Sequence, residues 1–251
     1  DLFSTRSQAV HPLSTLCRAG AIFGISDTAV RTALLRLTRE GKIESAGRGL
    51  YRAVANSDAM RERVLRWRNV LARQRPTWSG KWILALAGPS TRVDRTTWRR
   101  TLRAMELDGL RQMDADAWVR PDNLMGGAPD LRERMRELGA AKSLLVARLD
   151  GIEPERARQW AELWDVEARQ ITLSDLRRRL AESATRLAGR VDDEAAAETL
   201  TLGRTAVRAI LRDPLLPAEI APGEPLRQLI EEMIQYDQLG KRVWRGWIST
   251  T

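Results

Sequence analysis

The chain has 251 residues, of which 43% are hydrophobic and 30% charged, and this balance excludes an intrinsically disordered protein. No run of about 20 apolar residues is present, so no membrane-spanning helix is predicted, and the first residues lack the apolar core of a signal peptide. Cys17 and His11 are the single cysteine and histidine, which excludes an internal disulfide and a thiolate or imidazole metal cluster. We expect a cytoplasmic protein with no membrane partner, metal or cofactor.

Positive charge is concentrated near the N-terminus. The formal net charge is +9, and residues 1–75 contain 14 basic and 6 acidic residues, a net of +8. A bias toward arginine explains why 38 of the 42 basic residues are arginines, but it does not explain the asymmetry. The first 75 residues are therefore predicted to bind a polyanion, most simply nucleic acid. The alternative is a merely well-solvated segment.

Residues 1–55 begin with the pattern of two helices joined by a short turn. The first helix is predicted over 12–23, where Gly24 can adopt the left-handed conformation that ends it. Ser26 is a strong N-cap for a second helix over 27–40, whose apolar residues recur at the helical period. These residues are Val30, Ala33, Leu34 and Leu37.

A hairpin and a basic helix follow. Two short strands are predicted over 42–46 and 50–54, with a glycine-rich loop between them. A helix over 59–74 ends before Arg75-Pro76, which marks a domain boundary. Helix, turn, helix and hairpin form the winged helix-turn-helix pattern, in which the second helix enters the major groove of DNA.

The middle segment, 76–152, alternates strands and helices. The predicted elements are a strand at 81–87, a helix at 96–108, strands at 110–113 and 117–120, a helix at 129–138 and a strand at 143–149. The order β-α-β-β-α-β is the ferredoxin-like pattern.

The last segment, 153–251, has few strand signals and a net charge of −2, which makes it a poor candidate for nucleic-acid binding. Its helices are predicted at 154–164, 173–188, 195–212 and 225–239. The fold class is therefore α+β. Its predicted parts are a winged helix-turn-helix domain (1–55), a connecting helix (56–75), a central ferredoxin-like domain (76–152) and an all-helical C-terminal domain (153–251).

The second helix and the hairpin supply the candidate DNA contacts. Arg31 is suited to bidentate pairing with a guanine edge, and Arg48 at the hairpin tip is suited to the minor groove or the backbone. Each of these charges, taken singly, could simply solvate an outer face, but the hairpin and the local charge together favour DNA. The candidate residues are Ser26, Thr28, Arg31, Thr32, Arg36, Arg39, Lys42, Arg48 and Arg52.

The residues of the two helices and the hairpin resemble those of the PaaX family, the repressors of phenylacetate degradation and their relatives. The similarity lies in 24–37, 41–45, 49–52, 78–82, 118–121 and 212–217. The resemblance implies a homodimeric transcriptional repressor that an aryl-acetyl-CoA type effector releases from operator DNA. Leu35 stands where the family pattern has a small polar residue, so a different operator sequence is expected.

Nine tryptophans suggest an aromatic ligand site, although core packing is the simpler explanation for most of them. The candidate residues for an acyl-CoA-like effector are Trp78, Trp82, Trp118, Arg120, Arg148 and Trp244. An enzyme is not expected, because the sequence has no phosphate-binding loop, no nucleophilic triad and no acid at the end of strand 81–87. The alternative function is a metabolite-sensing interaction module whose winged helix binds protein instead of DNA.

Overall fold

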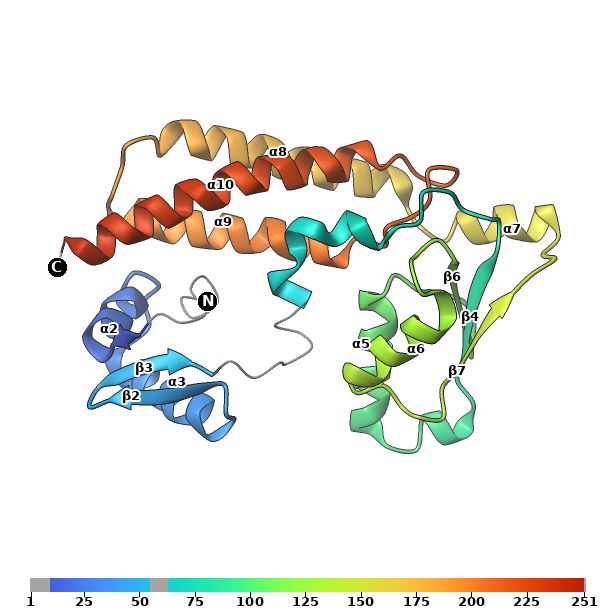
Figure 1. The fold of residues 1–251 in the computed structure, drawn as a ribbon, viewed down its shortest axis with the longest axis horizontal. Coiled ribbons are helices and arrows are strands. Elements are labelled where there is room, and N and C mark those ends of the chain that lie inside the picture. Colours follow the sequence, from blue (N-terminus) through green and yellow to red (C-terminus); the bar gives the residue numbers. More distant parts are fainter. Residues whose placement is uncertain (1–9, 55–62, 251) are drawn as a thin grey trace. The chain divides into compact units, whose positions relative to one another are not determined.

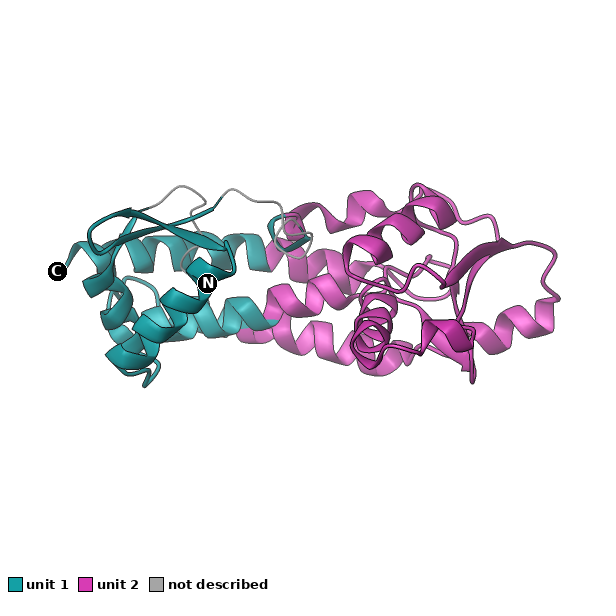
Figure 2. Ribbon diagram, turned by 90° about the horizontal axis from the view of Figure 1, so that it is seen from below, with its two compact units in different colours: residues 1–65, 180–205, 233–251 teal, residues 66–179, 206–232 magenta. Residues whose placement is uncertain are grey.

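The computed structural model describes residues 10–54 and 63–250 (Figure 1). The chain divides into two compact units (Figure 2). The first consists of residues 1–65, 180–205 and 233–251, and the second of residues 66–179 and 206–232. The helices predicted to form one C-terminal domain therefore contribute to both units.

The N-terminal part of the first unit contains two helices and a small antiparallel sheet. Its elements are β1 (His11–Pro12), α2 (Leu13–Ala21), α3 (Asp27–Arg39), β2 (Ile43–Gly47) and β3 (Leu50–Ala53), and the strand order is β1-β3-β2. Leu16 of α2, Leu34 of α3 and Ile43 of β2 are buried together in its core. The predicted helix, turn, helix and hairpin are confirmed, with β1 as an additional strand.

The second unit is built on a four-stranded antiparallel sheet. Its elements follow in the predicted order as β4 (Trp82–Leu86), α5 (Arg95–Leu107), β5 (Arg111–Asp114), β6 (Ala117–Pro121), α6 (Gly127–Glu137) and β7 (Leu145–Leu149). The strand order is β5-β6-β4-β7, so β4 and β6 lie in the centre. Their register pairs Ile83 with Arg120 and Ala85 with Trp118.

Alternation along these strands creates two different apolar faces. Ile83 and Trp118 point into a core that α5 and α6 complete with Met105 and Leu131. The neighbouring residue Trp82 belongs to the other face, together with Val119 of β6. Its buried partners from outside the sheet are Trp160, Trp164, Leu216 and Ala221.

Four further helices follow the sheet: α7 (Pro154–Ala161), α8 (Val166–Arg186), α9 (Asp193–Arg212) and α10 (Glu224–Ser249). The start predicted for α8 at residue 173 is wrong, because Asp165 accepts a hydrogen bond from the Ala168 backbone and caps an earlier first turn. No helix among the described residues combines the length and apolar character needed to cross a bilayer.

The end predicted for α10 at residue 239 is also wrong. Gly240 and Gly246 lie inside the helix rather than ending it. A Cβ atom on Gly246 would lie 2.8 Å from a methyl group of Val191, and one on Gly240 would lie 3.5 Å from Thr199. Gly246 therefore permits close packing against Val191, which outweighs its low helix propensity, whereas the distance at Gly240 is an ordinary van der Waals contact.

The helix predicted over 59–74 is only partly confirmed. Residues 55–62 lie outside the described part, and the segment Trp67–Arg73 (η1) is a 3₁₀ helix with non-helical angles at Asn69. The helix ends at Arg73. The main-chain groups of Arg73 and Arg75 form hydrogen bonds with the loop that follows β6. These long-range bonds determine where the helix ends.

A buried arginine on β6 holds the second unit together. The Arg120 guanidinium donates to the backbone carbonyls of Asp108, Pro121 and Pro214 and to the side-chain oxygen of Asn123. The residue is 2% exposed, and burial lowers the pKa of its guanidinium while Asp108 counteracts that shift. Arg120 therefore joins the end of α5, the sheet and the segment after α9.

Replacing Arg120 with alanine would leave several buried carbonyls without a donor. We expect Arg120→Ala to lower the free energy of unfolding of the second unit by about 3–5 kcal/mol. Urea denaturation followed by tryptophan fluorescence measures this change. The exposed Arg148 on β7 is the control, and Arg148→Ala should stay within about 0.5 kcal/mol of wild type. Equal stability of the two variants would contradict the structural role of Arg120.

Candidate nucleic-acid interface

Helix α3 is stabilised by its N-cap, and one apolar face packs it against the rest of the N-terminal part. The Ser26 hydroxyl accepts a hydrogen bond from the Ala29 backbone N–H at 3.3 Å, as its position predicts. Asp27 lies in the first turn, where the positive end of the helix dipole favours a carboxylate. Leu34 is buried and Val30 and Leu37 pack beside it. The predicted apolar face is thus confirmed, and the opposite face is left for other contacts.

The opposite face of α3 is open to solvent. Thr28, Arg31, Thr32 and Leu35 lie along it at intervals of three and four residues, and all four are exposed. Leu35 is 61% exposed although it is a large apolar residue. The Thr32 hydroxyl donates to the Thr28 carbonyl at 2.9 Å, which leaves its oxygen lone pairs and methyl group on the surface. This face therefore offers a cation, two hydroxyls and an apolar side chain side by side.

Some of the predicted cationic contacts already have acidic partners. Lys42 bonds to Glu40 at 2.8 Å, and this hydrogen bond lowers the pKa of the Glu40 carboxyl. Arg36 lies 3.9 Å from the same carboxylate, and Arg52 pairs with Glu44 on the neighbouring strand. These three residues are thus partly neutralised within the fold.

Three other predicted contacts lack such a partner. Arg31, Arg39 and Arg48 are exposed, and none of them forms an ion pair with a described residue. They are therefore the predicted residues whose charge is fully available to a polyanion.

The hairpin presents Arg48 at its tip. Gly47 and Gly49 flank it with positive φ angles of 144° and 71°, which side chains rarely adopt. The Gly49 carbonyl accepts the backbone N–H of Leu13 at 2.8 Å, so the tip is tied to the start of α2. Arg48 therefore projects from a fixed loop next to the helical pair.

Arg18 was not among the predicted residues, yet it anchors the two-helix part within the first unit. Its guanidinium donates to the Trp247 carbonyl at 2.6 Å and lies 3.7 Å from the centre of the indole ring. The Trp247 indole N–H bonds to Asp193 at 2.6 Å. The partners are more than 170 residues away in sequence, so no local pattern indicates the contact. The pocket beside it, about 570 Å³, is lined by Arg18, Arg190, Val191, Asp192, Asp193, Glu194, Trp247 and Thr250.

The residues predicted to bind an effector are not gathered at one place in the second unit. Trp82 is fully buried and contacts Trp78 with ring centres 5.5 Å apart. Trp118 lies in the core on the other face of the sheet. The guanidinium of Arg120 donates its hydrogen bonds to the buried acceptors described above and does not face a ligand site. Arg148 is exposed on the edge strand β7.

The sixth predicted residue, Trp244, belongs to the first unit and packs against Trp247 with ring centres 5.2 Å apart. Of the six, Trp78, Arg148 and Trp244 thus retain exposed or half-buried surface. Within the described ranges, no group of three or more His, Cys, Asp or Glu side chains is placed to hold a metal ion.

No family model matches the chain, and no curated protein matches it. Its fold is similar to that of an uncharacterized protein of Mycobacterium tuberculosis, Rv0674, with a TM-score of 0.61 and 22% sequence identity. The match covers 98% of this chain and 96% of that chain. The comparison establishes a mixed helix-and-strand fold that extends over both proteins.

The cap of α3 can be tested without any ligand. We expect Ser26→Ala to weaken the helix by about 1 kcal/mol and Ser26→Gly by only a few tenths, because glycine is a tolerated N-cap. Hydrogen exchange at the α3 amides measures this local opening. Unchanged protection in the alanine variant would show that the hydroxyl does not stabilise α3.

Proposed function

We propose that the chain is a DNA-binding transcriptional regulator of the PaaX type, which represses a catabolic operon. In this proposal α2 and α3 form a helix-turn-helix, α3 is the recognition helix, and the β2–β3 hairpin is the wing. The strand order β5-β6-β4-β7 with two helices on one face supports the ferredoxin-like interpretation of the central segment.

The open face of α3 is the observation that carries the proposal. A recognition helix needs polar side chains on the surface opposite its core contacts, and α3 has Thr28, Arg31 and Thr32 there. In the proposed complex Arg31 pairs with a guanine edge, and the two threonines contact a base or a thymine methyl group. Leu35 adds an apolar surface suited to a thymine methyl group.

Charge supports the same conclusion. Residues 1–75 hold a net charge of +8, and the cations without ion-pair partners, Arg31, Arg39 and Arg48, lie on α3 and the wing. In the proposed complex Arg39 holds a backbone phosphate, while Arg48 enters the minor groove or grips the backbone. Lys42, Arg36 and Arg52 contribute by exchanging a carboxylate partner for phosphate.

The remaining parts of the proposal are a homodimer and an effector. Two N-terminal parts bind half-sites about 10 base pairs apart, or a multiple of that distance, on an inverted repeat. An acyl-CoA-like effector relieves repression. The exposed Arg148 and the half-buried Trp78 and Trp244 are its candidate contacts, since Trp82, Trp118 and Arg120 are committed to packing and buried hydrogen bonds.

Binding to the DNA upstream of the chain's own gene tests the proposal. If a dimer neutralises about 6–10 phosphates, its affinity should fall by about 10³–10⁵ between 50 and 200 mM salt. Gel shift with and without aryl-CoA thioesters measures both binding and release. Binding that neither depends on salt nor prefers one sequence would contradict a sequence-specific regulator and favour the interaction module.

Two single substitutions separate base contacts from backbone contacts. Arg31→Ala should cost about 1–3 kcal/mol of binding free energy on the best sequence and relax sequence preference, because it removes a base contact. Arg48→Ala should weaken binding to all sequences alike. Titration of each variant against matched and scrambled duplexes measures the difference. Arg156→Ala is the control, because Arg156 is exposed on α7, outside the proposed DNA contacts, and this variant should keep wild-type binding.

A further inference from the structure

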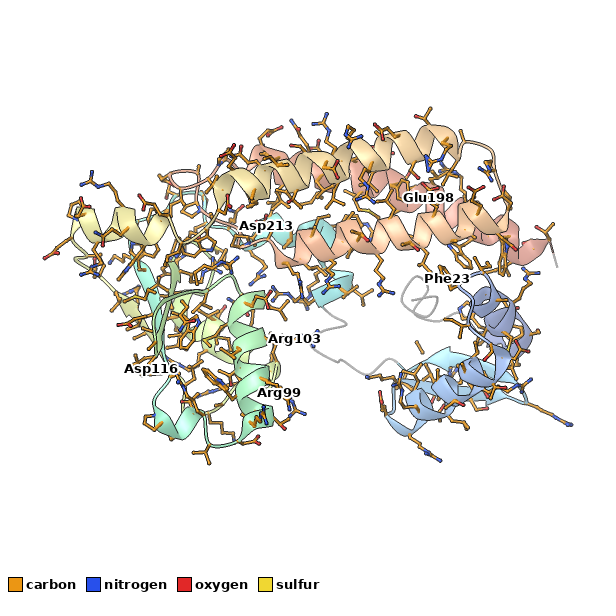
Figure 3. All side chains as sticks on the ribbon, turned by 180° about the vertical axis from the view of Figure 1, so that it is seen from behind. Phe23, Arg99, Arg103, Asp116, Glu198 and Asp213 are labelled. Atoms are coloured by element: carbon orange, nitrogen blue, oxygen red, sulfur yellow. The ribbon has the colours of Figure 1, made fainter. Side chains whose placement is uncertain are left out.

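Helix α5 carries a row of arginines on its outer side. Arg95, Arg99 and Arg103 follow at intervals of four residues, which places them on one side of the helix about 6 Å apart along its axis. Arg100 lies beside the row, and all four residues are exposed. Figure 3 shows Arg99 and Arg103 projecting from the outside of α5, away from the sheet. We call these four residues the arginine stripe.

The arginine stripe accounts for the charge excess of the middle segment. Helix α5 contains four arginines and one glutamate, a net charge of +3, and residues 76–152 with 13 basic and 10 acidic residues have the same net charge. None of the four forms an ion pair with a described residue, whereas Arg73, Arg134 and Arg169 in the same unit each bond to a buried aspartate. Among the described residues the positive charge of the stripe is therefore only slightly offset, by the electrostatic attraction between Asp94 and Arg100.

This arrangement is electrostatically unfavourable in the free protein. Like charges four residues apart on a helix repel one another. Arg95 is in addition the first residue of α5, where the helix dipole disfavours a cation and where the Asp94 carboxylate already accepts hydrogen bonds from the Thr96 and Thr97 backbone N–H groups. Bound anions relieve the repulsion between the arginines, and a regular series of anions matches the row better than a single one.

We propose that the arginine stripe binds the phosphate backbone of duplex DNA as a second, sequence-independent contact. Guanidinium groups bind phosphate oxygens in bidentate geometry, and phosphates recur at regular intervals along a duplex. The inference rests on the proposed function, because it gives a chain that binds DNA through α3 a second basic surface for the same polyanion. Contacts to phosphates add affinity and leave sequence choice to α3.

Four full-length proteins test this proposal. They are the wild type, the stripe variant Arg99→Ala/Arg103→Ala, an α3 variant Arg31→Ala/Arg39→Ala and a control Arg156→Ala/Arg208→Ala. The control removes two exposed arginines of the same unit outside α5, so its net charge equals that of the stripe variant. Each protein is titrated into a labelled mixed-sequence duplex of about 40 base pairs at several salt concentrations, which gives the slope of log K against log salt.

We expect the slope of the stripe variant to be shallower than that of wild type by about 1.8, or about 0.9 for each lost phosphate contact, and the control to keep the wild-type slope. A stripe variant with the wild-type slope, or a control with an equal loss, overturns the inference. If in that case the α3 variant is weakened, the proposed function stands.

The converse result, a weakened stripe variant with an unaffected α3 variant, retains the stripe, and the recognition role of α3 is then decided by the titrations against matched and scrambled duplexes. A wild-type chain that does not bind the duplex at any salt concentration overturns the stripe, and binding to the upstream DNA then decides the proposed function. Alanine preserves helix propensity and removes like-charge repulsion, so the melting temperature of the stripe variant should not fall. Should it fall, Arg99→Gln/Arg103→Gln replaces the alanine pair in the same titration.

Discussion

The burial of Arg120 is the constraint on which the second unit depends. A guanidinium without solvent must find acceptors for its N–H groups, and here three backbone carbonyls and one amide oxygen supply them. Asn123 extends the same arrangement, because its amide donates to the Leu215 carbonyl at 2.6 Å. The segment after α9 is thereby fixed to the end of β6, even though Leu215 adopts a left-handed backbone conformation with φ of 53°.

The same network fixes the direction of α5. Asp108 follows the last turn of this helix, and its carboxylate accepts from Arg73 at 2.9 Å and from Arg134 at 3.2 Å while its carbonyl accepts from Arg120. A buried carboxylate held by cations from η1 and α6 cannot shift without losing several charge-assisted bonds. The end of α5 is therefore held in place by this network, and the outer side of the helix is presented on an anchored element.

Pairing divides the arginines of this chain into two groups. Those that bond to carboxylates within the fold, such as Arg169 with the buried Asp213, stabilise particular contacts between elements. Among the described residues, those that project without a carboxylate include Arg31, Arg39 and Arg48 on the N-terminal part and the four arginines of α5. Both proposals concern this second group, because a guanidinium that the fold leaves unpaired is the one free to bind phosphate.

The elements whose signals are local could be predicted from the amino-acid sequence. The Ser26 cap, the apolar period of α3 and the β-α-β-β-α-β order of the middle segment all depend on residues close together in the chain, and the structure contains each of them. The exposure of Arg31 could also be predicted, because this residue lies on the face of α3 opposite the apolar residues. The burial of Arg120, which was expected to face a ligand, and the continuation of α10 through Gly246 against Val191 could be seen only in the folded chain. Burial and close packing depend on partners distant in sequence, which periodicity and capping do not report.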